Sequence, residues 1–107
     1  MGREINEPFD KESLRLLCRA FASLETEQEC MDFLEDLMTI REVQDISQRL
    51  YVAKLLQEGE PYAKIIARTC VSSATISRVN RCYSYGSGGY RRVLERIARQ
   101  DQEEDQA

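Results

Sequence analysis

Apolar residues recur at helical spacing along most of this chain, and no stretch shows the alternating period of two that is typical of a strand. Gly59 and the turn-rich run of residues 84–89 interrupt the pattern. The pattern therefore predicts an all-α fold with six helices. The first two helices are expected to begin at Asp10 and Thr26, and the others to cover about residues 40–58, 62–68, 73–83 and 89–99.

Three of the predicted helices have recognisable start signals. An N-cap side chain accepts a hydrogen bond from a free amide of the first turn, and in a capping box a glutamate three residues later returns the bond. The three signals are Asp10, with a hydrophobic staple between Phe9 and Leu14, and the capping boxes Thr26-x-x-Glu29 and Thr39-x-x-Glu42.

The apolar stripes are more extensive than a small monomer can easily bury. Each large apolar side chain left in water loses about 1.5–3 kcal/mol of burial free energy. We therefore expect a second copy of the chain to bury these residues, and the sequence predicts a homodimer. The expected inward residues are Leu14, Leu17, Cys18, Phe21 and Leu24 of the first helix, Cys30, Phe33, Leu34, Leu37 and Met38 of the second, Val43, Ile46, Leu50, Ala53 and Leu55 or Leu56 of the third, and Tyr90, Val93, Leu94 and Ile97 of the sixth.

The stretch from Tyr62 to Arg81 reads as two short helices separated by a tight break. The second of them opens with small hydroxyl residues and then turns basic at Arg78 and Arg81. Small polar side chains let a helix approach base edges, and the arginines beyond them can reach phosphate or guanine. This layout predicts a helix-turn-helix that reads the major groove of DNA.

Charge is segregated along the chain although the net charge is −4. Residues 1–60 carry a balance of −7, residues 61–100 a balance of +7, and the last seven residues, 101–107, a balance of −4. Because the local field attracts a polyanion more directly than the total charge does, the basic segment supports double-stranded DNA as the partner. An acidic protein partner for this basic face is the alternative, which would make the chain a protein-interaction module.

Composition limits the remaining classes of fold and function. The 107 residues suit a single domain, 1–107, with dimerisation helices in 10–58, the helix-turn-helix in 62–83, a C-terminal helix in 89–99 and an acidic tail in 100–107. Without histidine or a nucleophile constellation, we expect neither an enzyme nor a metal site. The four cysteines are expected to be small buried hydrophobes. No membrane span or signal segment is apparent, so a cytoplasmic protein is expected.

Three runs of residues resemble the Trp repressor superfamily, and within it a branch of bacterial Trp-repressor-like proteins of unassigned role. The runs are Gly59-Glu60-Pro61-Tyr62, Ala74-Thr75-Ile76-Ser77-Arg78-Val79-Asn80-Arg81-Cys82 and Tyr85-Gly86-x-x-Gly89-Tyr90. The resemblance covers roughly residues 10–98. It implies an all-helical, intertwined homodimer in which the N-terminal helices of two chains wrap each other, and a transcription regulator that binds DNA.

The resemblance also places functional residues. Base contacts would fall on Ser73, Ala74 and Ser77, and phosphate contacts on Ser84 or nearby basic residues. From the charge pattern we add Arg81, which would read or line the groove with these residues, and Lys64, Arg68 and Arg78 on the DNA backbone side. The DNA-binding set is thus Ser73, Ala74, Ser77, Arg78, Arg81, Lys64, Arg68 and Ser84.

A corepressor site is implied in the tryptophan-responsive members, and its counterparts here are Thr39, Arg49 and Arg78. Those members have a glycine after the recognition-helix arginine, whereas this chain has Val79, whose branched side chain should crowd the indole. We therefore predict no cofactor and disfavour L-tryptophan, while a regulator gated by another amino-acid-like ligand stays an alternative. Two further departures are Cys70, at a turn position usually held by glycine, and Ile66, at a position usually held by alanine. A turn of this kind often needs φ > 0, so we infer a left-handed conformation at Cys70.

Overall fold

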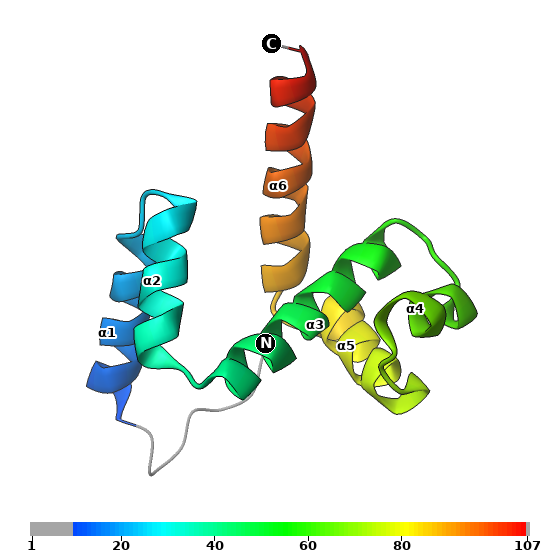
Figure 1. The fold of residues 1–107 in the computed structure, drawn as a ribbon, viewed down its shortest axis with the longest axis horizontal. Coiled ribbons are helices and arrows are strands. Elements are labelled where there is room, and N and C mark those ends of the chain that lie inside the picture. Colours follow the sequence, from blue (N-terminus) through cyan, green and yellow to red (C-terminus); the bar gives the residue numbers. More distant parts are fainter. Residues whose placement is uncertain (1–9, 107) are drawn as a thin grey trace. The chain divides into compact units, whose positions relative to one another are not determined.

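The computed structural model describes residues 10–106, which form six α-helices and contain no strand (Figure 1). The chain divides into two compact units, Gly2–Gln44 and Asp45–Ala107, and the boundary falls inside the third helix. The all-α prediction is confirmed. In chain order the helices are α1 (Lys11–Ala22), α2 (Glu27–Leu37), α3 (Ile40–Gln57), α4 (Tyr62–Thr69), α5 (Ser73–Tyr85) and α6 (Gly89–Gln106).

The predicted start signals of the first three helices are present. Asp10 accepts a hydrogen bond from the Glu12 amide at 3.0 Å. The Thr39 box is reciprocal: the Thr39 hydroxyl accepts from the Glu42 amide at 3.1 Å, and the Glu42 carboxylate accepts from the Thr39 amide at 2.9 Å. The bond that the Thr39 amide donates to the Glu42 carboxylate, and after it the Thr39 side chain, lower the pKa of Glu42. Phe9 of the predicted staple lies outside the described residues.

The Thr26 box differs in one detail from the expected arrangement. The Thr26 hydroxyl accepts from the Glu29 amide at 3.1 Å, as predicted. The Glu29 carboxylate, however, accepts from the amide of Glu25 at 3.0 Å, one residue before the N-cap. The longer reach still satisfies a backbone amide at the start of α2.

Helices α1 and α2 lie in the first unit and have no buried side chain. The rings of Phe21 and Phe33 meet edge to face, with centroids 5.4 Å apart. Several other large apolar side chains are mostly in solvent, including Leu16 at 68% exposure and Met31 at 62%. This unit is therefore a helix pair with aromatic contact but without an enclosed core.

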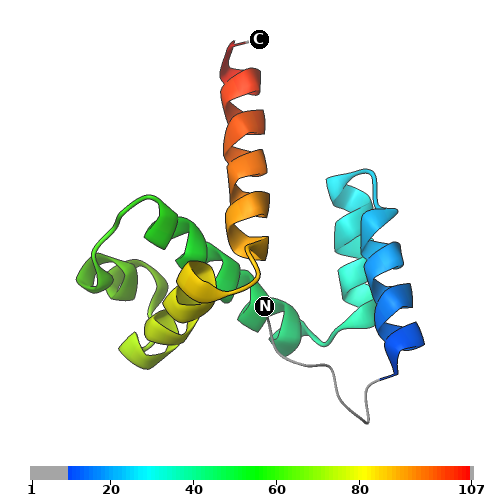
Figure 2. The ribbon, with the colours of Figure 1, turned by 180° about the vertical axis from the view of Figure 1, so that it is seen from behind.

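The buried core lies entirely in the second unit, where α3, α4, α5 and α6 each contribute. Figure 2 shows the same helices from behind, with α6 leading away from the end of α5. Burial raises the pKa of Tyr90, one of the half-buried residues at the core edge. The core residues are Val52, Ala53, Leu55, Ile65, Ile76, Val79 and Leu94, with Leu56, Val71, Tyr83 and Tyr90 packed against them.

The inward face predicted for α3 is only partly correct. Ala53 and Leu55 are buried as expected, but Ile46 and Leu50 are exposed, and Val52 takes a core position that was not predicted. An 18-residue helix makes five turns, so it can carry one apolar stripe near its start and another near its end. Only the later stripe faces the core of this chain.

Helix α6 is longer than predicted, because it continues through the acidic residues to Gln106 instead of ending near residue 99. Glutamate and glutamine are good helix formers, and no glycine or proline interrupts this segment. Leu94 is buried as predicted, whereas Val93 and Ile97 are exposed in the single chain. Helix α5 likewise runs two residues beyond its predicted end, to Tyr85.

The prediction that the cysteines are buried is wrong for this chain. Cys18, Cys70 and Cys82 are exposed and Cys30 is half-buried. Cys18 lies on a helix with no buried residue, and Cys70 lies in a surface turn. Their exposure therefore follows from their places in the fold and not from the apolar character of the side chain. Within residues 10–106 there is no group of side chains that could hold a metal ion, and no helix has the length and hydropathy needed to cross a bilayer.

Candidate nucleic-acid interface

Helices α4 and α5 are joined by a tight turn in residues 70–72. Cys70 has φ 61° and ψ 18°, and it is the only non-glycine residue with positive φ among those described. Its amide donates to the Ile66 carbonyl at 2.8 Å, which closes α4. The left-handed conformation inferred at this position is therefore confirmed, although a non-glycine residue there costs about 1–2 kcal/mol.

The two helices are held together by a small apolar centre. Ile65 of α4 and Ile76 and Val79 of α5 are buried, and Val71 of the turn is half-buried against them. Ile66 is exposed, so Ile65 alone supplies the buried contact of α4. This arrangement defines a helix-turn-helix unit, residues 62–85.

The start of α5 is capped by Ser72, whose hydroxyl accepts from the Thr75 amide at 3.1 Å. The first residues of the helix, Ser73 and Ala74, are exposed, as is Ser77 one turn later. The cap thus orders the turn while leaving small side chains at the positive end of the helix dipole, where a phosphate is favoured.

The exposed and buried faces of α5 are opposite each other. At 100° per residue, positions 73, 74, 77, 78 and 81 cluster on one side of the helix, and positions 76, 79 and 83 cluster on the other. Arg78 and Arg81 are exposed, and no hydrogen bond or ion pair within residues 10–106 engages either guanidinium. Five of the eight predicted DNA-binding residues thus share one accessible face.

The other three predicted residues have partners within the chain. Lys64 lies 3.7 Å from the carboxylate of Glu60. Arg68 donates to the Tyr51 hydroxyl at 2.8 Å, and Ser84 donates to the Asn80 side chain at 3.3 Å. The sequence pattern identified these three side chains as polar but had no means of showing that each already has a neighbour.

The residues proposed for a corepressor are distributed over both units. Thr39 belongs to Gly2–Gln44, where its hydroxyl and amide form the capping box with Glu42. Arg49 and Arg78 belong to Asp45–Ala107 and are exposed. Val79 is a core residue, which places its branched side chain in the packing of the helix-turn-helix unit. The corepressor role stays a prediction.

Sequence reasoning overlooked the aromatic partners of two arginines. The guanidinium of Arg68 lies 5.8 Å from the ring centroid of Tyr51, and that of Arg91 lies 4.5 Å from the ring centroid of Tyr83. The first pair joins residues 17 positions apart, and no local spacing rule links positions so distant in sequence.

With this geometry established, comparison with known proteins defines the family. The sequence profile of the Trp repressor protein family matches residues 12–98. The chain belongs to the Trp repressor family, whose members are regulatory DNA-binding proteins and not enzymes. It is thus a DNA-binding regulator by family, with the helix-turn-helix unit as its candidate interface.

Individual relatives agree with this assignment. The chain is 44% identical over 96 residues to the uncharacterised protein YerC of Bacillus subtilis (strain 168), covering 90% of this chain and 84% of YerC. The crystal structure of a TrpR-like protein from Eubacterium eligens matches with a TM-score of 0.77 and 46% identity, covering 81% of this chain and 90% of that one. A candidate Trp repressor from Staphylococcus aureus matches with a TM-score of 0.77 and 41% identity, covering 81% and 87%.

Proposed function

We propose that this protein is a transcription regulator that binds a specific DNA sequence as a homodimer. The observation that carries the proposal is the accessible face of α5, where small side chains at the helix start are followed by two arginines without partners in residues 10–106. Ser73, Ala74 and Ser77 would approach base edges, while Arg78 and Arg81 would contact guanine or phosphate.

The exposed apolar residues support the homodimer. Leu16 lies away from the Leu14–Leu17–Phe21 stripe of α1 and is 68% exposed, and a leucine left in water forfeits about 1.5–3 kcal/mol. Ile40, at the start of α3, is 79% exposed. A second copy would cover both residues, and a two-fold dimer would present two α5 helices to successive major grooves about 34 Å apart.

Val79 supports a regulator that does not depend on tryptophan. Its side chain is buried beside Arg78, in a position where a glycine would leave open space. We therefore expect the preferred duplex to bind equally well with and without L-tryptophan.

Selection of bound duplexes from a random pool tests the function directly. We expect a preferred sequence with two related half-sites, and an affinity for it that falls linearly with salt on logarithmic axes. Arg81→Gln should weaken binding and, if Arg81 meets a phosphate, reduce the salt slope by about 1.8, because each subunit of the dimer loses one phosphate contact. Arg99→Gln on α6 removes the same charge and should leave the selected sequence unchanged.

The same selection distinguishes the alternative. A pool that returns no enriched sequence, together with equal binding of all duplexes, would contradict sequence-specific reading. A protein-interaction module would then be the better description of the basic segment.

A further inference from the structure

Two hydrogen bonds join different helices within residues 10–106, and both come from an arginine paired with a tyrosine. Arg68 of α4 donates through Nη2 to the Tyr51 hydroxyl of α3 at 2.8 Å. Arg91 of α6 donates through Nε to the backbone carbonyl of Tyr83 in α5 at 3.0 Å. In both pairs the guanidinium also lies over the tyrosine ring, 5.8 Å and 4.5 Å from its centroid. Each pair thus combines a directional bond with a cation–π contact.

The two pairs lie on either side of the helix-turn-helix unit. The first ties its first helix, α4, to α3, and the second ties its second helix, α5, to α6. Apolar packing alone restrains α4 weakly, because only Ile65 of its eight residues is buried. Tyr51, in contrast, directly precedes the buried residues Val52 and Ala53, so its backbone is fixed in the core.

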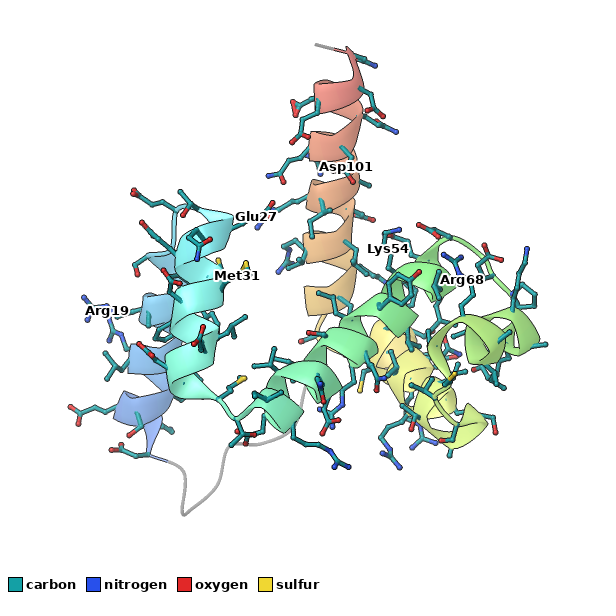
Figure 3. All side chains as sticks on the ribbon, in the orientation of Figure 1. Arg19, Glu27, Met31, Lys54, Arg68 and Asp101 are labelled. Carbon is teal, nitrogen blue, oxygen red and sulfur yellow. The ribbon has the colours of Figure 1, made fainter. Side chains whose placement is uncertain are left out.

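The surroundings of Arg68 agree with a position against α3. Figure 3 shows Arg68 beside the last turns of α3, where Lys54 also lies. The carboxylate of Glu58, 2.7 Å from the Lys54 ammonium, raises the pKa of Lys54, and the nearby positive charge of Arg68 opposes this effect. Arg68 therefore belongs to a polar group on the α3 side of α4, which is a different location from the accessible face of α5.

We propose that Arg68–Tyr51 and Arg91–Tyr83 are positioning pairs, which fix the direction of α5 and thereby its discrimination between DNA sequences. The proposal rests on the proposed function and changes the role expected for Arg68, from a phosphate contact to an interhelical brace. A brace affects the specific complex, in which α5 must enter the groove in one direction, more than it affects loose binding to the DNA backbone.

The test of the first pair compares Tyr51→Phe, Arg68→Gln and the double variant in the full-length protein. Each single variant should weaken binding to the selected duplex by about five- to a hundredfold, because the dimer loses one hydrogen bond in each of its two subunits. Binding to random duplex and the salt slope should stay as in the wild type. The double variant should be no weaker than the single variants, because both remove the same interaction.

The second pair is tested by Arg91→Lys, which keeps the charge but loses the Nε–H donor and the planar stacking group. We expect weaker binding to the selected duplex, with binding to random duplex and the salt slope unchanged. Arg96→Lys makes the same exchange at another exposed arginine of α6 and should have no effect.

A measurement without DNA keeps this proposal separate from the proposed function. The amides of Ile65 and Ile76 should exchange with solvent faster in Tyr51→Phe than in the wild type. If the wild-type protein selects no duplex, the proposed function fails. Exchange in Tyr51→Phe still tests the brace in that case: faster exchange would support it, and unchanged exchange would overturn it. The brace is also overturned if Arg68→Gln lowers the salt slope by about 1.8 on every duplex, about 0.9 for each subunit of the dimer, while Tyr51→Phe changes nothing.

Discussion

The two units of this chain bury their apolar residues to very different extents. Among residues 10–106, the seven buried side chains all belong to Asp45–Ala107, whereas α1 and α2, in Gly2–Gln44, bury none. Side-chain caps nevertheless start helices in both units, at Asp10, Thr26 and Thr39 in the first and at Ser72 in the second. This difference shows that an apolar stripe predicts a helix with a face to be buried. It does not indicate whether the same chain or a partner buries that face. The proposed recognition helix, α5, lies in the unit that supplies its own core.

The largest effect is expected from a cavity in the second unit. Leu55 is 1% exposed and contacts the other core residues, so Leu55→Ala should lower the free energy of unfolding by about 2–5 kcal/mol. Urea denaturation at fixed protein concentration measures this change. Leu55→Met, which conserves volume, is the matched control and should cost less than about 1.5 kcal/mol. Equal, small losses for both variants would mean that this core is not the main source of stability.

A smaller effect is expected from a charge in the first unit. Leu16→Glu should have little influence on the fold of a single chain, since this side chain is already 68% exposed. In the proposed dimer it should raise the dissociation constant at least about tenfold, because burying a leucine contributes roughly 1.5–3 kcal/mol. Analytical ultracentrifugation measures the constant. Gln44→Glu adds a similar charge at an exposed polar position of the same unit, and an equal shift for both variants would contradict the assignment of Leu16 to the interface.

The smallest effect concerns the cap that starts α3. The hydrogen bonds from Thr39 lower the pKa of Glu42 below its ordinary value of 4.5, so the ionised carboxylate favours the folded cap. This contribution is fully present above that ordinary value and is lost as the pH falls through the lowered pKa. Exchange of the Thr39 amide should accordingly quicken, relative to the intrinsic rate, as the pH falls below about 4.5.

The control for this cap is Glu42→Gln, which keeps a hydrogen-bond acceptor but cannot titrate in this range. Its Thr39 amide should show no such pH dependence. The same dependence in both proteins would assign the effect to another group of the first unit.

Local features of the sequence predicted local features of the fold well. Asp10, Thr26 and Thr39 cap their helices because capping involves residues two to three positions apart. The left-handed turn at Cys70 followed from the resemblance of the helix-turn-helix segment, and the exposed residues of α5 followed from the distribution of its small and basic side chains. In each case, interactions within one helix or turn decide the outcome.

Other predictions failed because they depended on residues distant in sequence. The sequence predicted a single inward face for α3 that included Ile46 and Leu50, which are exposed. Packing against α4, α5 and α6 buried Val52 instead, together with Leu55. The pairing of Arg68 with Tyr51 depends in the same way on the close approach of two helices. The exposure of Cys18 likewise reflects what covers α1, which its own composition does not specify.

The sequence by itself determined the number and type of the elements, most of their boundaries and the chemical character of the α5 face, because hydrogen bonding and side-chain spacing within a helix are local. Only the tertiary structure decided which apolar stripes are enclosed and which arginines are left available. Burial and pairing require two segments to meet in space, and their meeting is a property of the whole packed chain. Arg81 and Arg68 are both arginines of one basic segment, yet only Arg68 has a tyrosine within reach.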